Sequence, residues 1–575
     1  MSRDFTGKRV TVLGLGVLSG GVASARYFAV RGADVTVTDL QPAEALRKSI
    51  DALAPWPVRY VLGEHRDEDI TGADLVVVGP AVRDDSPFLR LARDRGIPLT
   101  TETNLVFENC RRPVIGITGS NGKTTTTRLI GAMFQAVDPA TLVGGNIGRS
   151  VLNELADPDV ADGQDEAAEN GNPSGEASGP GATPGTGPGA TPGAGSTRVR
   201  PTDESPVILE LSSFQLHRLA WIRQSPGVAV VTNLSPNHLD WHGTFDAYEE
   251  AKQHIVHDQS PEDVAVLNAD DERLRGWAAR CPGRVAWFSM EGPVETGCYV
   301  RDGQVVFRGP AAGNAVSESS DASEEHGPAD GHDPADGGGP AERGLPGERV
   351  VCPVDALRLP GPHNRANLLA AVTAACLWGI PASVIRSTVG TFRGVEHRLE
   401  ELAEINDVGF YNDSACTTPA STITALRAFD APVVLIAGGY DKGMSFDGMA
   451  SELVRRARAA VLIGATADAI EAAIAKAGVA HAAGANAGAA LAAGGNANAT
   501  HTADAKAGTS DALAIGRSNS LDDAVRQSAG LARPGDVVVL SPGCASYDMF
   551  TNYEERGRRF KEAVAALARD ADDIA

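Results

Sequence analysis

Residues Val114 to Thr126 place an apolar strand, a glycine-rich turn, a lysine and a hydroxyl in immediate succession. This order is typical of a loop that binds a nucleotide triphosphate, because glycines let backbone amides approach phosphate oxygens. Lys123 supplies a positive charge, and Thr124 can ligate Mg²⁺. Ile117 stands where the strict pattern has its first glycine, which indicates a particular subset of such loops. An ordinary loop is the competing interpretation, and the flanking strand and helix disfavour it.

Two further metal-ligating side chains lie at or just after the ends of predicted strands. Glu210 lies near the end of one strand, and His238 comes shortly after the next. Because parallel strands end at the same edge of a sheet, both can reach a metal held by Thr124. We therefore expect two metal positions. For His238 taken alone, a surface or helix-cap role is the better interpretation. His238 and His242 could imitate a zinc pair, but the glutamate of the H-E-x-x-H pattern is missing.

A second glycine-rich turn, Gly14 to Gly20, follows the first predicted strand. It resembles a dinucleotide fingerprint, with Asp39 at the end of the second strand. Ser19 replaces the third glycine, so a nucleotide diphosphate fits as well as a dinucleotide, and a simple tight turn remains an alternative. We expect this loop to bind a phosphate group.

Short β-rich runs alternate with helical stretches along the chain, which predicts an α/β fold with parallel sheets. Strands are predicted at residues 9–13, 34–38, 74–78, 207–211, 228–232, 264–267, 433–437, 460–463 and 537–540. Three domains are expected: a Rossmann-like domain at 1–112, a central P-loop domain at 113–395 and a Rossmann-like domain at 396–575. Segments at about 157–204, 312–347 and 478–515 lack apolar residues for a core and are predicted to be disordered insertions.

The overall composition excludes several classes of protein. The chain has 575 residues and a formal net charge of −23, which disfavours nucleic acid and anionic membranes as partners. Its seven cysteines are scattered without a C-x-x-C pair, which favours reduced thiols. No run reaches the ~20 apolar residues of a spanning helix. We therefore expect a cytoplasmic protein that does not insert into membranes.

Eight motifs, taken together and in order, resemble the Mur ligase family, which adds amino acids to the peptidoglycan precursor. They are TGSNGKTTT (118–126), GGNIG (144–148), LELSSFQL (209–216), NHLDWHG (237–243), YEEAK (248–252), GPHNRAN (361–367), EHRLE (396–400) and SPGCASYDMF (541–550). The resemblance spans about residues 5–565 apart from the three insertions. It implies a monomeric ligase that uses ATP to activate the carboxylate of UDP-N-acetylmuramoyl-L-alanine as an acyl phosphate. The amine of D-glutamate then displaces phosphate.

The resemblance also implies roles for individual residues. ATP would be bound by Gly119, Ser120, Asn121, Gly122, Lys123, Thr124, Thr125, Asn364, Asn367, Arg398 and Asp413. Two Mg²⁺ ions would be held by Thr124, Glu210, His238 and Lys252, and the catalytic residues would be Lys123, Glu210, His238 and Lys252. The UDP substrate would contact Gly16, Val17, Leu18, Asp39 and Asn146, and glutamate would contact Thr417, Lys442, Ser546 and Tyr553.

Lys252 would act as a carbamate formed with CO₂. An ammonium group facing two cations is disfavoured, whereas a carbamate is an anionic oxygen ligand. Without the resemblance, a solvated lysine on a helix would be the better interpretation.

Two departures from the family pattern leave alternatives open. Ala415 stands where many glutamate-adding members have a lysine, so L-glutamate or another amino acid could be the substrate. Asn237 stands where an acidic residue is common. A folylpolyglutamate-synthase-like ligase, a Rossmann oxidoreductase and a non-catalytic nucleotide-binding protein are the other hypotheses. The oxidoreductase leaves Lys123, Glu210 and Lys252 unexplained, and the non-catalytic protein predicts a damaged lysine or metal ligand.

Overall fold

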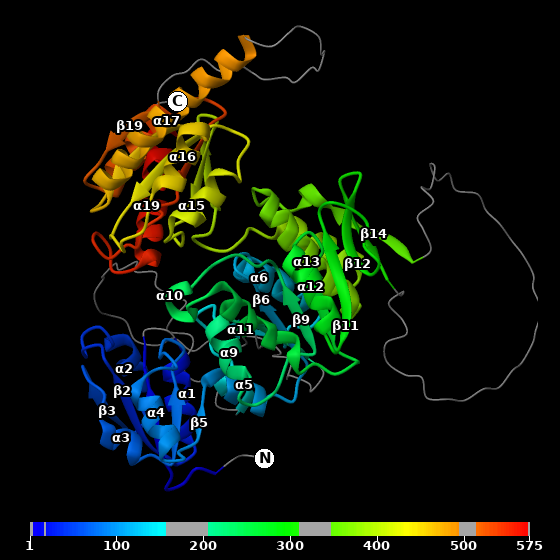
Figure 1. The fold of residues 1–575 in the computed structure, drawn as a ribbon, viewed down its shortest axis with the longest axis vertical. Coiled ribbons are helices and arrows are strands. Elements are labelled where there is room, and N and C mark those ends of the chain that lie inside the picture. The colour runs from blue at the N-terminus through cyan, green and yellow to red at the C-terminus, as the bar shows by residue number, and fades with distance from the viewer. Residues whose placement is uncertain (1–3, 17–18, 157–204, 310–346, 494–512, 573–575) are drawn as a thin grey trace, which may run out of the picture. The chain divides into compact units, whose positions relative to one another are not determined.

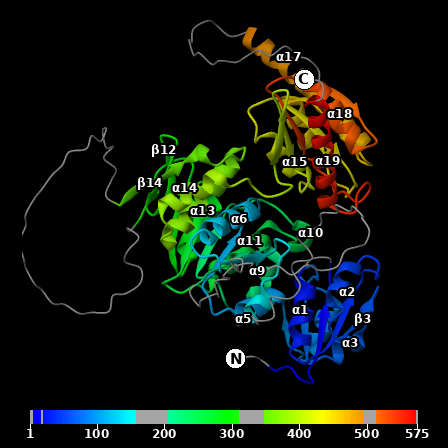
Figure 2. The same ribbon diagram turned by 180° about the vertical axis from the view of Figure 1, so that it is seen from behind.

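The computed structural model describes residues 4–16, 19–156, 205–309, 347–493 and 513–572. These form two compact units, one of residues 1–356 and 366–389 and one of residues 357–365 and 390–575. The predicted insertion at 157–204 and nearly all of that at 312–347 lie outside the described residues, as do Val17 and Leu18. Figures 1 and 2 show three sheets flanked by helices, so the predicted three-domain α/β fold is confirmed.

The first sheet is parallel and has the strand order β3-β2-β1-β4-β5. Its strands are β1 (Arg9–Leu13), β2 (Asp34–Asp39), β3 (Val58–Leu62), β4 (Leu75–Val78) and β5 (Leu99–Thr100). The helices are α1 (Ser19–Val30), α2 (Arg47–Leu53), α3 (Asp67–Thr71), α4 (Pro87–Asp94) and α5 (Glu102–Asn109). Alternate side chains of β1 enter different cores: Val10 packs with the α1 side and Leu13 with α3 and α4. Burial of both faces explains the apolar character of this strand.

The second sheet carries the phosphate loop after β6, the third strand from its β7 edge, in the order β14-β13-β12-β11-β10-β9-β6-β8-β7. Its strands are β6 (Val114–Thr118), β7 (Leu142–Gly145), β8 (Val207–Glu210), β9 (Val228–Val231), β10 (Val264–Asn268), β11 (Arg284–Ser289), β12 (Gly297–Arg301), β13 (Gln304–Arg308) and β14 (Glu348–Pro353). Strand β6 pairs in parallel with β8 and β9. The ends of these three strands therefore lie side by side.

Helices flank this second sheet and carry several candidate residues. They are α6 (Lys123–Gln135), α7 (Leu152–Ala156), α9 (Ser213–Leu219), α10 (Leu239–His242), α11 (Phe245–His257), α12 (Glu272–Trp277), α13 (Pro362–Trp378) and α14 (Ala382–Thr391), with 3-10 turns at Ala278–Arg280 and Val354–Ala356. Helix α9 begins with a capping box, in which Ser212 and Gln215 satisfy each other's backbone amides. This cap fixes where the chain leaves β8 and turns into the helix.

The third sheet has the order β15-β16-β20-β17-β18-β19. Its strands are β15 (Glu400–Ile405), β16 (Val408–Asn412), β17 (Val433–Gly438), β18 (Ala457–Ile463), β19 (Ala514–Arg517) and β20 (Val537–Leu540). The helices are α15 (Pro419–Leu426), α16 (Asp447–Arg456), α17 (Ala467–Ala493), α18 (Leu521–Leu531) and α19 (Tyr553–Asp572). Helices α15 to α17 cover one face and α18 and α19 the other, because successive β17 side chains enter different cores.

The predicted insertion at 478–515 is partly wrong. Residues 478–493 continue helix α17, and β19 begins at Ala514, while residues 494–512 lie outside the described residues. Alanine has the highest helix propensity, so an alanine-rich continuation extends a helix even without a polar–apolar pattern. Within the described part of the chain, no helix is both long enough and apolar enough to span a bilayer.

Candidate active site

The phosphate loop, residues 119–122, is held by the residues that follow β9. Thr232 Oγ1 donates to the carbonyl of Asn121 at 2.6 Å, and Asn233 exchanges two 3.0 Å hydrogen bonds with the backbone of Asn121. Gly119 has a φ of +148°, and a Cβ there would lie 1.9 Å from Thr232 Oγ1. Only glycine fits this position without displacing the residue that holds the loop.

Lys123 begins α6 and lies over the loop. Its Nζ donates to the carbonyls of Gly119 and Ser120, both at 3.0 Å. A Cβ on Gly122 would lie 2.1 Å from Asn367 Oδ1, so the predicted nucleotide residue Asn367 on α13 lies against the loop. The sequence separates these residues by more than two hundred positions, and the fold brings them together.

Lys252 on α11 is buried at the other side of the loop. Its Nζ donates to Thr118 Oγ1 at 3.0 Å and to the carbonyl of Gly119 at 2.9 Å. Burial, and then the charge of Lys123, hold the pKa of Lys252 well below its usual value, while Glu210 acts in the opposite direction. A lowered pKa shifts the equilibrium towards the neutral amine, which is the form that can react with CO₂.

Glu210 ends β8 with its side chain buried. Oε1 accepts a 3.0 Å hydrogen bond from Asn146 Nδ2, whereas Oε2 is buried and has no hydrogen-bond partner among the described residues. Thr124 and Thr125 lie half-buried in the first turn of α6. A buried carboxylate oxygen without a donor is a ligand type that Mg²⁺ prefers, and so is a hydroxyl at a helix start.

His238 adds a nitrogen ligand to this group. It precedes α10 in a left-handed conformation with a φ of 52°. Burial, and then the charge of Lys123, lower the pKa of His238, and Lys252 contributes in the same direction. The neutral imidazole carries the lone pair that a metal needs. Lys123 and Lys252 affect the pKa of His238, and Lys123 and Glu210 affect that of Lys252, so these predicted residues lie near one another. The carboxylate of Glu210 and the imidazole of His238 are ligand types that a divalent cation accepts.

The glycine turn of the first sheet is held by Asp39. Its Oδ2 accepts hydrogen bonds from the backbone amides of Leu15 and Gly16, both at 2.9 Å. In a dinucleotide fingerprint the corresponding acid binds a ribose, so this carboxylate contact to the turn departs from that pattern. Val17 and Leu18, which were predicted beside it, lie outside the described residues.

A cavity lies next to Asn146. Its walls come from the first sheet and from the residues around β7 and α9, and they contain both apolar and polar side chains. The lining residues are Gly20, Val78, Pro80, Thr101, Glu102, Thr103, Gly145, Asn146, Gly148, Ser150, Phe214, Gln215 and Arg218. Asn146 therefore reaches both this cavity and the Glu210 carboxylate.

Three of the residues predicted to bind the substrate glutamate lie on loops at the same edge of the third sheet. Thr417, Ser546 and Lys442 follow the neighbouring strands β16, β20 and β17. The amide of Tyr440 donates to the carbonyl of Ala545 at 2.9 Å, which joins the loops of Lys442 and Ser546. Ser546 is buried, whereas Lys442 is exposed. The order of the strands in the sheet thus places these side chains on adjacent loops.

Asp413 is buried below this edge. Its Oδ2 accepts from Ser541 Oγ at 2.8 Å and its Oδ1 from the amide of Leu399 at 3.3 Å. Burial raises the pKa of Asp413 to about 7, against the opposing effects of the Ser541 hydrogen bond and the Arg398 charge. Arg398 and Asp413, which were both predicted to bind ATP, are therefore near each other.

Asn364 and Tyr553, the remaining two predicted site residues, each form a hydrogen bond with a neighbouring loop. Asn364 lies in the first turn of α13, and its Nδ2 donates to the carbonyl of Pro360 at 2.8 Å. Tyr553 begins α19, and its carbonyl accepts from Ser414 Oγ at 2.8 Å. These contacts tie the ends of both helices to neighbouring loops.

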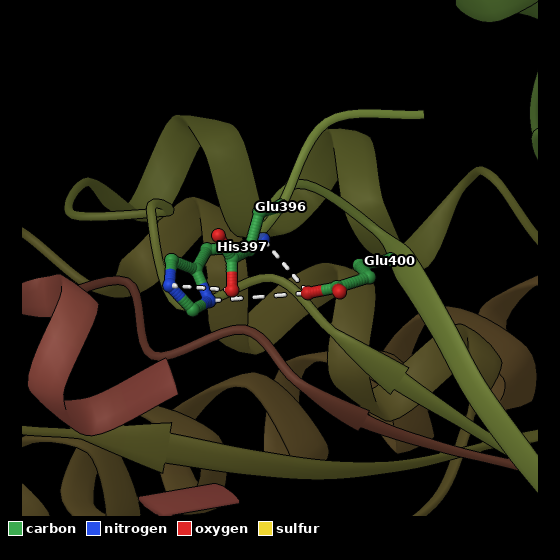
Figure 3. A group of neighbouring side chains, drawn as sticks. All are labelled: Glu396, His397 and Glu400. Atoms are coloured by element: carbon green, nitrogen blue, oxygen red, sulfur yellow. Dashed lines mark hydrogen bonds and ion pairs between the residues drawn. The ribbon is translucent and has the colours of Figure 1, made fainter. Parts of the chain in front are cut away.

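Glu396, His397 and Glu400 form a compact group in the second unit (Figure 3). His397 Nε2 lies 3.8 Å from Glu396, and its Nδ1 lies 3.9 Å from Glu400 and 2.9 Å from Asn412 Nδ2. Lys561 Nζ contacts both carboxylates at 2.7 and 2.6 Å. Because a lysine already balances these charges, the group is better explained as an ion-pair network than as a metal site.

Two residues that hold the loop, Thr232 and Asn233, were given no such role from the sequence. They follow β9 directly, at a strand end of the kind that selected Glu210, so the same argument reaches them. Tyr248, whose hydroxyl lies 3.0 Å from Ser120 Oγ, carries no such signal. Its position depends on how α11 packs.

Three segments of the chain match family models, and the whole chain is similar to known proteins. Residues 8–101 match the Mur ligase MurD-like N-terminal domain, 194–308 the Mur ligase middle domain and 397–544 the Mur ligase glutamate ligase domain. The chain is 37% identical to the UDP-N-acetylmuramoylalanine--D-glutamate ligase of Roseiflexus sp. (strain RS-1), over 98% of this chain and 100% of the relative. The chain belongs to the Mur ligase family.

Further similarities agree with this assignment. A protein of the same name from Symbiobacterium thermophilum is 36% identical to this Mur ligase over 98% of each chain. The solved structure of UDP-N-acetylmuramate-alanine ligase MurC from Thermotoga maritima has 17% sequence identity and a TM-score of 0.51, and covers 97% of this chain and 100% of that one. That likeness concerns the fold alone. The family predicted from the eight motifs is confirmed.

Proposed function

We propose that this Mur ligase uses ATP to join D-glutamate to UDP-N-acetylmuramoyl-L-alanine, as a monomer in the cytoplasm. The observation that carries the proposal is the convergence of Lys123, Glu210, His238 and Lys252 around one phosphate loop. The names of the relatives support the choice of substrates. All seven cysteines are free, in agreement with a reducing compartment.

The first chemical step transfers the terminal phosphoryl group of ATP to the donor carboxylate, which gives an acyl phosphate and ADP. In the second step the glutamate amine attacks the acyl carbon, phosphate leaves with the electrons of the broken C–O bond, and the nitrogen loses a proton. Lys123 and the loop amides would neutralise the phosphate charge. Asn364, Asn367, Arg398 and Asp413 would complete the ATP site.

Thr124, Glu210, His238 and a carbamate on Lys252 would hold two Mg²⁺ ions. When bound, these ions would neutralise the crowded negative charge of phosphates and carboxylate. The unpartnered Oε2 of Glu210 and the lowered pKa of Lys252 support this role. Carbamylation would turn a buried base into an anionic ligand.

Thr417, Lys442, Ser546 and Tyr553 would bind glutamate, with Lys442 facing its side-chain carboxylate. Gly16, Val17, Leu18, Asp39 and Asn146 would bind the UDP-linked donor. Because Ala415 is uncharged, the amino-acid site has one positive charge fewer than many glutamate-adding members of the family.

One assay tests the proposal. The enzyme is given ATP, Mg²⁺ and UDP-N-acetylmuramoyl-L-alanine, and ADP release is compared with D-glutamate, L-glutamate, lysine and diaminopimelate. D-glutamate should give the fastest release. Oxygen-18 in the donor carboxylate should appear in phosphate, and unlabelled phosphate would contradict the acyl phosphate. Preference for another amino acid would change the substrate and leave the activation step intact.

A further inference from the structure

Arg218 on α9 is almost completely buried, with 1% of its surface exposed. Its Nη1 donates to the carbonyl of Gly79 at 2.7 Å, and its Nη2 donates to the carbonyl of Val82. The carboxylate of Asp84 lies 3.7 Å from Nη2. Burial lowers the pKa of Arg218 to about 10, although Asp84 opposes the shift. The positive charge of Arg218 is thus buried away from water, which disfavours the charged form.

All these acceptors belong to one short segment, residues 79–84, which follows β4. A neighbouring contact strengthens the same connection, since His217 Nε2 lies 2.5 Å from Asp84 Oδ2. Helix α9 is also tied to α5, where Asn104 Nδ2 donates to the carbonyl of Arg218 at 3.1 Å. Helix α9 therefore fixes the conformation of the segment that leaves the first sheet.

The same arginine lines the cavity beside Asn146, together with Pro80 of the fixed segment and with Phe214 and Gln215 of α9. Its Nε is buried and has no hydrogen-bond partner among the described residues. Arginine has five N–H donors in a rigid plane, and a buried donor without an acceptor is costly. A ligand oxygen in the cavity would supply the missing acceptor.

The two carbonyls and Asp84 account for the Nη groups of Arg218, and a residue that only held the segment would need no further donor. The buried Nε–H is the donor that these contacts leave unexplained. A planar guanidinium can donate to two diverging carbonyls and still present a third N–H. That geometry suits a residue that shapes a binding pocket.

We propose that Arg218 is a positioning and specificity-determining residue of the donor pocket. It holds the 79–82 turn as one wall of the cavity and offers Nε–H to an oxygen of the UDP-linked muramyl donor. This inference rests on the proposed function, since it assumes that the donor occupies this cavity.

The test uses Arg218→Lys and Arg218→Met in the full-length enzyme. Lysine keeps the charge but not the plane of donors, and methionine keeps only part of the volume. We expect the KM for UDP-N-acetylmuramoyl-L-alanine to rise about tenfold or more in both, with the KM for ATP and for glutamate within about twofold of wild type. Titration calorimetry with the donor alone should show the same loss of affinity.

Arg223→Met is the matched control, because Arg223 is an exposed arginine just after α9 that pairs with Asp258 and does not line this cavity. Its donor KM should stay near that of wild type. If Arg218→Lys binds the donor as wild type does and loses only thermal stability, the residue is structural and the inference is overturned. Failure of the wild type itself to bind the donor would instead refute the proposed function.

Hydrogen–deuterium exchange on the wild type decides the case in which neither variant folds. Adding the donor without ATP should slow exchange in peptides that cover residues 79–84 and 214–219. Unchanged exchange in both segments, in an enzyme that turns over the donor, overturns the inference.

Discussion

Lys252 and Lys442 are both proposed active-site lysines, yet they lie in opposite surroundings. Lys252 is buried, donates to Thr118 and Gly119, and has a lowered pKa. Lys442 is exposed on a loop after β17. The side chain in the first region is already held by the fold, whereas the second region presents a long side chain that must be ordered when its proposed ligand arrives.

This difference has a physical reason. Fixed dipoles and charges stabilise a developing charge most when water is excluded and no reorganisation is needed. An exposed lysine loses rotamer freedom on binding, which reduces its net contribution. Changes in the phosphate-loop region should therefore lower kcat, and changes in the loops of the third sheet should mainly raise KM.

Replacing Lys123 should have the largest effect. Lys123→Ala removes the positive charge at the loop and should lower kcat for ADP release by about 10²- to 10³-fold or more, as loss of a preorganised donor does. Arg128→Ala is the control, because Arg128 is exposed on the same helix. Circular dichroism should show both variants folded. Near-normal turnover by Lys123→Ala would remove the phosphate-loop assignment.

Replacing Lys252 separates a carbamate from a plain lysine. Lys252→Ala should lose about 10²-fold or more of kcat, and millimolar acetate should restore part of it by supplying a carboxylate in the vacated space. Acetate should not help Lys123→Ala, which lacks a cation and not an anion. Mass spectrometry at high bicarbonate should detect the carbamate on the wild type, and absence of both rescue and modification would count against it.

Replacing Lys442 probes the exposed side of the comparison. Lys442→Ala should raise the KM for glutamate by about 10- to 100-fold while the KM for ATP changes little, because one charge-assisted contact is lost. Lys476→Ala is the control, since Lys476 is an exposed lysine of the same unit that pairs with Asp447 at 3.0 Å. A fall in kcat with unchanged glutamate KM would show that both regions are preorganised.

The smallest change is expected for Asp413→Asn and concerns stability. Folding raises the pKa of Asp413 from 3.8 to about 7. The contribution of this carboxyl group to the free energy of unfolding is therefore fully present below pH 3.8 and is lost as the pH rises through about 7. The free energy of unfolding of the variant should decline less with pH and should exceed that of wild type by on the order of 1–3 kcal/mol at pH 8. Urea unfolding from pH 4 to 8 measures it, and parallel curves for the two proteins would contradict the burial argument.

Much of the fold follows from local patterns. The strand at 537–540 is observed as β20, because β-branched residues buried on both faces leave an unbroken apolar run. The strand at 9–13 is observed as β1, where Val10, Thr11 and Val12 are β-branched and buried. Strands β12 to β14 were missed, since their mixed exposure gives weaker patterns. The helix at 478–493 was missed because alanine forms helices without an amphipathic signal.

Sequence alone determined the phosphate loop, since the strand, the glycines, Lys123 and Thr124 are neighbours along the chain and constrain one another locally. Only the tertiary structure decided the lowered pKa of Lys252, whose hydrogen-bond partner Thr118 is 134 positions away. It also decided the hydrogen bonds of Arg218, whose acceptor Gly79 is 139 positions away. Charge state and hydrogen bonding depend on burial and on distance in space. Those quantities are set when distant segments pack together, and no local pattern encodes them.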